Sequence, residues 1–140
     1  MAAIGKFLTQ ATLILAVITD PGQLCAATPD QLISEYAAEA KNTVKDFSAE
    51  AGRKFFLAVR KNSKGEMASC AGCHTKDPKQ SGKTRAGKVI DPMAIVANKD
   101  RFTDKAKVEK WFKRNCKDVY ERACTAHEKG DFITFMKSVK

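Results

Sequence analysis

Two cysteines three residues apart, with a histidine directly after the second, are the feature that most constrains this chain. They are Cys70 and Cys73 in the sequence Cys-Ala-Gly-Cys-His, and the histidine is His74. This spacing is typical of the attachment site of a c-type haem, because both sulfurs can form thioethers with the vinyl groups of one haem. The adjacent imidazole is then in position to bind the iron as its proximal ligand. The motif therefore predicts one covalently bound haem.

Residues 1–27 have the pattern of a secretory signal peptide. Lys6 is their only basic side chain, a mostly apolar run covers 7–18, and Pro21-Gly22 precedes a small-residue end. The apolar run is too short to span a bilayer, and the breaker at Pro21-Gly22 argues against the alternative of an N-terminal core helix. We expect cleavage after Ala27 and a periplasmic location. This agrees with the haem motif, since such haems are attached outside the cytoplasm.

The remaining residues, 28–140, are expected to form a single monomeric domain. The whole chain has 25 Lys+Arg and 16 Asp+Glu, a net charge of +9. For an exported protein we interpret this charge as attracting an acidic protein or an anionic membrane surface, not nucleic acid. The predicted loop 75–88 holds five of the basic residues. It is interpreted either as a solvated surface or as a docking patch beside the haem.

Cys116 and Cys124 are the other two cysteines of the mature chain, and in an oxidising compartment we expect them to form a disulfide. Eight residues of continuous helix would separate them by about 12 Å, whereas a disulfide needs Cα atoms within about 7 Å. A helix must therefore end between them. A zinc site built from Cys70, Cys73 and two of Cys116, Cys124 and His127 is an alternative.

The hydrophobic periodicity predicts an almost wholly helical domain with no strand pattern. The first expected helix begins at a capping box formed by Thr28 and Gln31. A second follows Ser48 and contains Phe56, ending at 62–65. A turn at 90–95 is expected to lead into a brief helix.

Two further helices are expected in the C-terminal part of the chain. A strong helix is capped by Thr103. Four of its residues, Val108, Trp111, Phe112 and Asn115, share one face. The last helix is expected to stop and restart at Gly130 and Asp131.

The second axial ligand of the iron decides the function, and the candidates are Met93, Asn115, His127, Met136 or none. Met136 lies on an apolar helical face and is interpreted as a residue of the hydrophobic core. His127 has charged neighbours and is interpreted as a surface residue. Met93 would give the low-spin iron of an electron carrier, but it follows His74 by only 19 residues. Asn115 ends an apolar stripe, where an unpaired amide is costly unless something binds it.

Several segments resemble the SHP-type cytochromes c, named for the sphaeroides haem protein. The similarity lies in Ile90-Asp91-Pro92-Met93-Ala94, in Arg101-Phe102-Thr103-Asp104, in the run from Lys107 to Cys116, in Cys124-Thr125 and in Glu128-Lys129-Gly130-Asp131. The resemblance implies a small class I-like, all-α cytochrome c fold of about four to five helices around one haem c, with an extra N-terminal helix.

The resemblance also implies roles for residues and partners. Asn115 would be the sixth ligand, which leaves the iron on reduction and lets small molecules bind, and Cys116 and Cys124 would be disulfide-bonded. Trp111, Phe112 and Phe56 are expected to line the haem pocket. The implied electron source is a dihaem cytochrome c with a membrane b-type cytochrome.

Two functions are consistent with these residues. In the first, an amide oxygen, which is a hard donor, binds ferric iron and releases softer ferrous iron, so that reduction opens a site for O₂ or NO. In the second, the chain is a conventional electron carrier with Met93 on the iron. No motif assigns catalytic residues or decides whether the chain is an enzyme.

Overall fold

The computed structural model describes residues 26–140, so nearly all of the predicted signal peptide lies outside the described residues. Its helices are α1 (Pro29–Glu39), the 3₁₀ helix η1 (Val44–Asp46), α2 (Ala49–Leu57), α3 (Cys70–His74), α4 (Lys105–Tyr120) and α5 (Ala126–Ser138). Two short antiparallel ladders pair β1 (Arg60–Lys61) with β2 (Met67–Ala68) and β3 (Gly82–Lys83) with β4 (Val89–Ile90). The prediction of a helical domain with an extra N-terminal helix is confirmed. No helix within 26–140 combines the length and apolar character needed to cross a bilayer.

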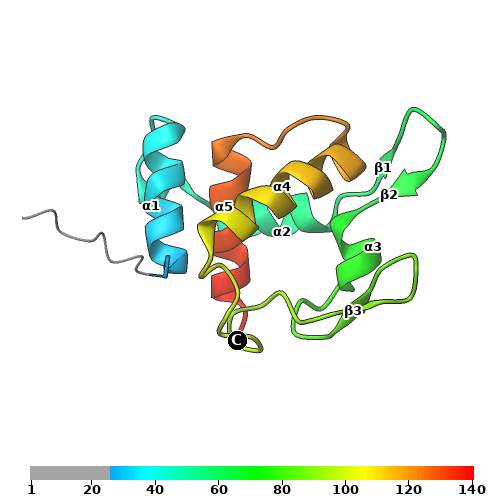
Figure 1. Cartoon of the computed structure of the whole chain (residues 1–140). Coiled ribbons are helices and arrows are strands. Elements are labelled where there is room, and N and C mark those ends of the chain that lie inside the picture. The colour runs from blue at the N-terminus through cyan, green and yellow to red at the C-terminus, as the bar shows by residue number, and fades with distance from the viewer. Residues whose placement is uncertain (1–25) are drawn as a thin grey trace, which may run out of the picture.

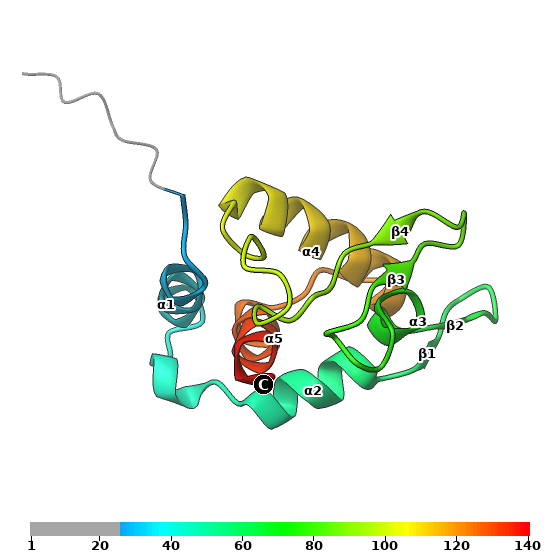
Figure 2. The same cartoon turned by 90° about the horizontal axis from the view of Figure 1, so that it is seen from below.

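Helix α5 is the centre of the fold, with α1, α2 and α4 arranged around it (Figures 1 and 2). Its buried residues are Ala126, Gly130, Asp131, Phe132, Ile133, Phe135 and Met136. They cover more than one face of the helix, as expected for a helix enclosed by its neighbours. Met136 is fully buried, which confirms the prediction that it fills the core.

The expected interruption of the last helix at Gly130 and Asp131 was wrong, because α5 is continuous through both. Gly130 is needed for packing: a Cβ atom there would lie 2.3 Å from the ring of Phe47. Asp131 is 6% exposed, and its carboxylate accepts a hydrogen bond of 2.7 Å from the backbone N–H of Ser48. Tertiary contacts with the segment before α2 therefore explain both residues.

Helices α2 and α5 cross with their backbones in contact. A Cβ atom on Gly52 would lie 2.0 Å from the carbonyl oxygen of Asp131 and 2.9 Å from the Cβ of Phe135. Next to this crossing, Phe56 is fully buried, with its ring centroid 6.1 Å from that of Phe132. This crossing therefore fixes how closely α2, the helix that precedes the haem motif in the chain, packs against α5 in the core.

Several element boundaries differ from the prediction. Helix α2 ends at Leu57, and the chain from there forms β1, so that 62–65 is the turn of a hairpin. Asp104, not Thr103, caps α4, and its side chain accepts a 3.0 Å hydrogen bond from the N–H of Lys107. The brief helix expected after 90–95 is absent from the described residues, which form turns there. Thr28 and Ser48 cap their helices as predicted.

Helix α1 is joined to α4 and α5 through one carboxylate. The hydroxyl of Tyr36 donates to Oε1 of Glu109, and Nζ of Lys129 donates to Oε2 at 2.7 Å. Burial raises the pKa of Tyr36, and the hydrogen bond to Glu109 raises it further. Burial also acts to raise the pKa of Glu109, but the hydrogen bonds from Lys129 and Tyr36 outweigh it and the pKa is lowered. The ionised carboxylate of Glu109, on α4, therefore links α4 to α1 and α5.

The Glu109→Gln variant is expected to lose less stability in acid than the wild type. A carboxylate with a lowered pKa contributes stability above its ordinary value of 4.5 and loses it as the pH falls through the folded-state pKa. Thermal unfolding at pH 7 and pH 3 measures the difference. Glu50→Gln is the control, since Glu50 forms an exposed ion pair with Lys54. Equal acid losses in both variants would contradict the role of Glu109.

Candidate functional site

Helix α3 holds the two cysteines and the histidine of the motif within five residues. The side chain of Ser69 caps it, accepting a 2.9 Å hydrogen bond from the N–H of Gly72. Both thiols, of Cys70 and Cys73, are half-buried and unpaired. Burial raises the pKa of Cys70 to about 11. The helix therefore presents two thiols one turn apart, the spacing that thioether formation with one haem requires.

The imidazole of His74 is in the form that binds a metal. Its Nδ1 is buried and has no hydrogen-bond partner among the described residues. Burial, together with the charge of Arg101, lowers its pKa to about 4, so the ring is neutral at pH 7. A buried polar atom without a partner costs free energy unless a ligand or ordered group meets it. The thiols and the neutral imidazole together fit a c-type haem.

The hairpin of β3 and β4 packs directly on this helix (Figure 2). A Cβ atom on Gly82 would lie 2.0 Å from the carbonyl oxygen of Cys73 and 2.9 Å from the Cα of His74. The predicted loop 75–88 is therefore partly ordered as a ladder, which the sequence pattern did not indicate. Lys83 and Lys88, two lysines of this segment, have exposed side chains.

The segment that contains Met93 is fastened to the chain just after His74. The carbonyl of Pro78 accepts hydrogen bonds from the N–H of Met93 at 2.8 Å and of Ala94 at 2.9 Å. Arg101 donates from Nε to the carbonyl of Pro92 at 2.8 Å. These bonds hold Met93 beside the segment that follows the predicted proximal ligand.

Asn115 lies on α4, one residue before the disulfide. It is half-buried, and its side chain makes no hydrogen bond with the residues that the structure describes. Cys116 and Cys124 are joined in the structure, with their Cα atoms 5.6 Å apart. The helix ends at Tyr120, and Glu121 follows with a left-handed φ of 55°. The disulfide thus connects the end of α4 to the start of α5, next to Asn115.

The three residues expected in the haem pocket occupy different surroundings. Phe112 and Phe56 are both buried and both lie against Phe132, at centroid distances of 5.4 and 6.1 Å. Trp111 is 43% exposed, with the guanidinium carbon of Arg114 5.6 Å from its ring centroid. Phe132 is therefore a shared neighbour of two of the three, and Trp111 lies at the solvent-exposed edge of the stripe.

The zinc alternative is wrong for the residues described here. Cys116 and Cys124 are consumed by the disulfide. No group of three or more potential metal ligands exists within 26–140. His127 contacts Asn42 at 2.6 Å and Asp131 at 3.5 Å. Its nitrogens are therefore engaged by these side chains.

Sequence reasoning missed Ser69 and Gly82, and it named Arg101 only as part of a segment shared with the family, without a role. A serine directly before the motif was a usable signal, because serine is a preferred helix N-cap. The roles of Gly82 and Arg101 depend on long-range contacts, for which the local sequence has no pattern.

Comparisons with known proteins identify relatives of this chain. The family model described as "Domain of unknown function (DUF1924)" matches residues 42–136. The cytochrome c-type protein SHP of Cereibacter sphaeroides is 40% identical over 129 residues, which are 92% of this chain and 98% of that protein. Cytochrome c'' of Methylophilus methylotrophus is 41% identical over 86 residues, 61% of this chain and 60% of that protein.

Two solved structures have the same fold. The structure of oxidised SHP, described as an oxygen-binding cytochrome c, matches with a TM-score of 0.74 and 42% identity, over 81% of this chain and 98% of that one. Oxidised cytochrome c'' from Methylophilus methylotrophus matches with a TM-score of 0.70 and 34% identity, over 80% and 94%. The predicted small all-α cytochrome fold is confirmed.

Proposed function

Because this chain belongs to the family of SHP-type c-type cytochromes, we propose that it is an exported electron-transfer protein whose reduced haem binds a small diatomic molecule. Its cofactor is one haem c. When bound, this group supplies an iron that exchanges one electron and can take a small ligand. Cys70 and Cys73 hold it through thioethers, and His74 is its proximal ligand.

Asn115 is the second axial ligand in this proposal. Its half-buried amide without a partner is the observation on which the assignment rests. Both polar atoms of this side chain are accessible to water and bound to no other side chain within 26–140, so the amide is free to bind an iron placed beside it. The neighbouring disulfide at Cys116 restricts where this amide can move.

The position of Met93 supports the same choice. Two hydrogen bonds to the carbonyl of Pro78 hold the backbone at Met93 and Ala94 close behind His74. A ligand from this segment would have to reach around the haem to its other side. Asn115 comes from a different helix and avoids that constraint.

Reduction is proposed to release Asn115. An amide oxygen is a hard, neutral donor that suits ferric iron better than ferrous iron. The released amide still has two N–H donors, which can hydrogen-bond to a diatomic held nearby. With the haem in place, reduction would thereby make room for O₂ or NO beside the Asn115 amide.

The surroundings of the protein are part of the proposal. The segment 1–27 directs export, so the mature protein works in the periplasm as a monomer. The SHP-type resemblance suggests a dihaem cytochrome c and a membrane b-type cytochrome as the electron source. The net charge of +9 favours an acidic partner over nucleic acid.

The absorption spectra of the haem-loaded protein test this function. We expect a high-spin ferrous form that takes up CO or NO, and a ferric form in which the same site is closed. A conventional electron carrier with Met93 on the iron would instead show a sulfur-to-iron charge-transfer band when oxidised and no CO uptake when reduced. That pair of results would overturn the proposal.

A further inference from the structure

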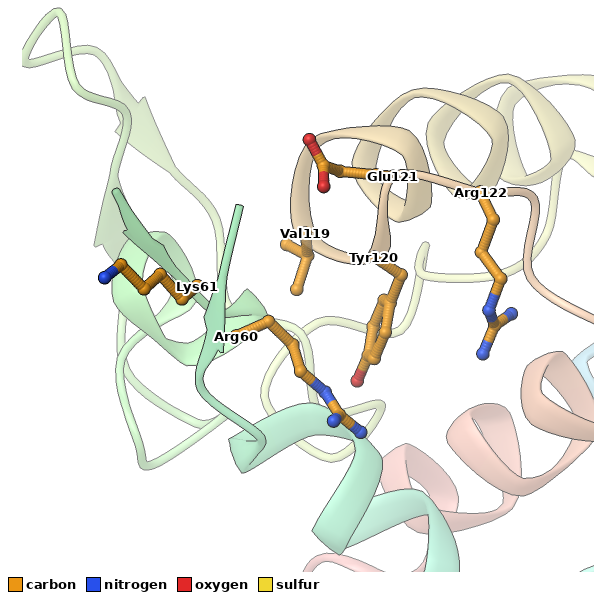
Figure 3. Close-up of a pocket in the computed structure, with 6 residues that line it drawn as sticks. All are labelled: Arg60, Lys61, Val119, Tyr120, Glu121 and Arg122. Carbon is orange, nitrogen blue, oxygen red and sulfur yellow. The ribbon is translucent and has the colours of Figure 1, made fainter. Parts of the chain in front are cut away.

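A recess of about 280 Å³ lies between β1 and the end of α4 (Figure 3). Its lining residues are Arg60, Lys61, Val119, Tyr120, Glu121 and Arg122. The ring of Tyr120 forms one wall, and Arg60 and Arg122 lie on either side of it in the view. Neither the haem motif nor Asn115 lines this recess.

Two cations in the recess lack an anionic partner among the described residues. Arg122 is neutralised, because it donates to both carboxylate oxygens of Glu128 at 2.8 and 2.6 Å. Glu121 is also occupied, accepting hydrogen bonds from the N–H and hydroxyl of Ser63. The side chains of Arg60 and Lys61 form no hydrogen bond or ion pair within 26–140 and are exposed. The unpaired charge of the recess is positive.

Two contacts with Phe55 hold the ring of Tyr120, which forms the wall of the recess next to Arg60, in one position. Tyr120 stacks on Phe55 with centroids 4.6 Å apart and ring planes 7° from parallel. Its hydroxyl donates a 2.6 Å hydrogen bond to the carbonyl of Phe55. The guanidinium carbon of Arg60 lies 5.6 Å from the ring centroid of Tyr120. This contact favours one position of the guanidinium and lowers the entropy lost when it binds an anion.

The recess is also close to the attachment site of the haem. Arg60 pairs with Ala68 across the ladder of β1 and β2. Two residues after Ala68, the chain reaches Cys70, which packs against the same core cluster as Tyr120. A group seated on Arg60 would therefore lie near one thioether.

We propose that this recess is the docking point for an anionic group of the redox partner, with Arg60 as the residue that receives it. The proposal rests on electron transfer as the proposed function. A preformed cation beside the cofactor would both attract an acidic partner and bring it near the haem. The hairpin of β3 and β4 offers exposed charges such as Lys83, which does not line this recess, and it serves as the comparison.

Binding of a redox-inert anion tests the docking point separately from electron transfer. Hexacyanocobaltate(III) is titrated into the full haem-loaded protein and followed by ¹H–¹⁵N NMR. The largest shifts are expected at Arg60, Lys61 and Tyr120, and they should be lost in Arg60→Glu but kept in Lys83→Glu. Shifts centred on Lys83 and Lys88, or none at all, would overturn the proposal.

The rate of electron transfer gives the second readout. In anaerobic stopped flow, one electron passes from the ferrous protein to ferricyanide, which becomes ferrocyanide. At low ionic strength, Arg60→Glu is expected to slow electron transfer to ferricyanide at least about tenfold more than Lys83→Glu does. Lys83→Glu is the control, because it changes the net charge by the same amount. With tris(phenanthroline)cobalt(III), a cationic oxidant, Arg60→Glu should be the faster variant. Equal rates for the two variants would show that only net charge matters and would refute the docking point.

Failure of the proposed function is recognised separately. A ferrous protein that takes up no CO would contradict the diatomic site, whereas the anion titration would still report on Arg60.

Discussion

The Asn115→Ala variant is expected to bind imidazole in its oxidised state at least about tenfold more tightly than the wild type does. An internal ligand lowers the apparent affinity for an external one by the fraction of molecules in which the site is open. Under the proposed ligation, removal of the Asn115 amide would leave the site open in both oxidation states. Titration of the ferric protein with imidazole, followed by absorption, gives the two dissociation constants.

Met93→Ala is the matched variant for this experiment. It removes the rival axial ligand, a side chain that is 9% exposed and whose backbone is bound to Pro78. We expect its ferric spectrum and imidazole affinity to stay close to those of the wild type. If Met93→Ala opens the ferric site and Asn115→Ala does not, the assignment of the axial ligand is refuted.

Gly52→Ala is expected to destabilise the protein by about 3 kcal/mol or more. The added Cβ would lie 2.0 Å from the carbonyl oxygen of Asp131, so α2 and α5 must separate. Overpacking of this kind costs more than the roughly 1 kcal/mol that alanine gains over glycine within a helix. Denaturant unfolding of the haem-loaded protein measures the loss.

Gly87→Ala is the control for the loss of glycine alone. Gly87 has a φ of +78° and no atom within 4 Å of an added Cβ. Its substitution should cost about 1 kcal/mol of backbone strain without any clash. A loss at Gly52 no larger than at Gly87 would mean that the helix crossing can relax.

The parts of this fold that sequence reasoning predicted well are local. Thr28 and Ser48 were recognised as caps because the side chain and the N–H it accepts from are three residues apart. Helix α4 was recognised because its apolar spacing repeats along the chain, but its buried residues are Phe112, Cys116 and Val119, and Trp111 is exposed. The haem motif was recognised because its two thiols and its imidazole lie within five consecutive residues.

The parts that were mispredicted depend on contacts between distant segments. Gly130 looks like a helix breaker in the sequence, yet the ring of Phe47 is what requires it. The β3–β4 ladder has strands of two residues, too short to show an alternating pattern. The place of Phe56 beside Phe132 follows from the crossing of α2 and α5 and from no local signal.

The disulfide at the end of α4 has a kinetic consequence under the proposed ligation. An Asn115 amide released from the iron stays on a helix whose end is covalently closed through Cys116 and Cys124. Its return is intramolecular and is governed by an effective concentration, which a short tether keeps high. A diatomic molecule therefore competes with a ligand that never diffuses away. Under this ligation, rebinding of the amide would be a first-order process whose rate does not depend on the protein concentration.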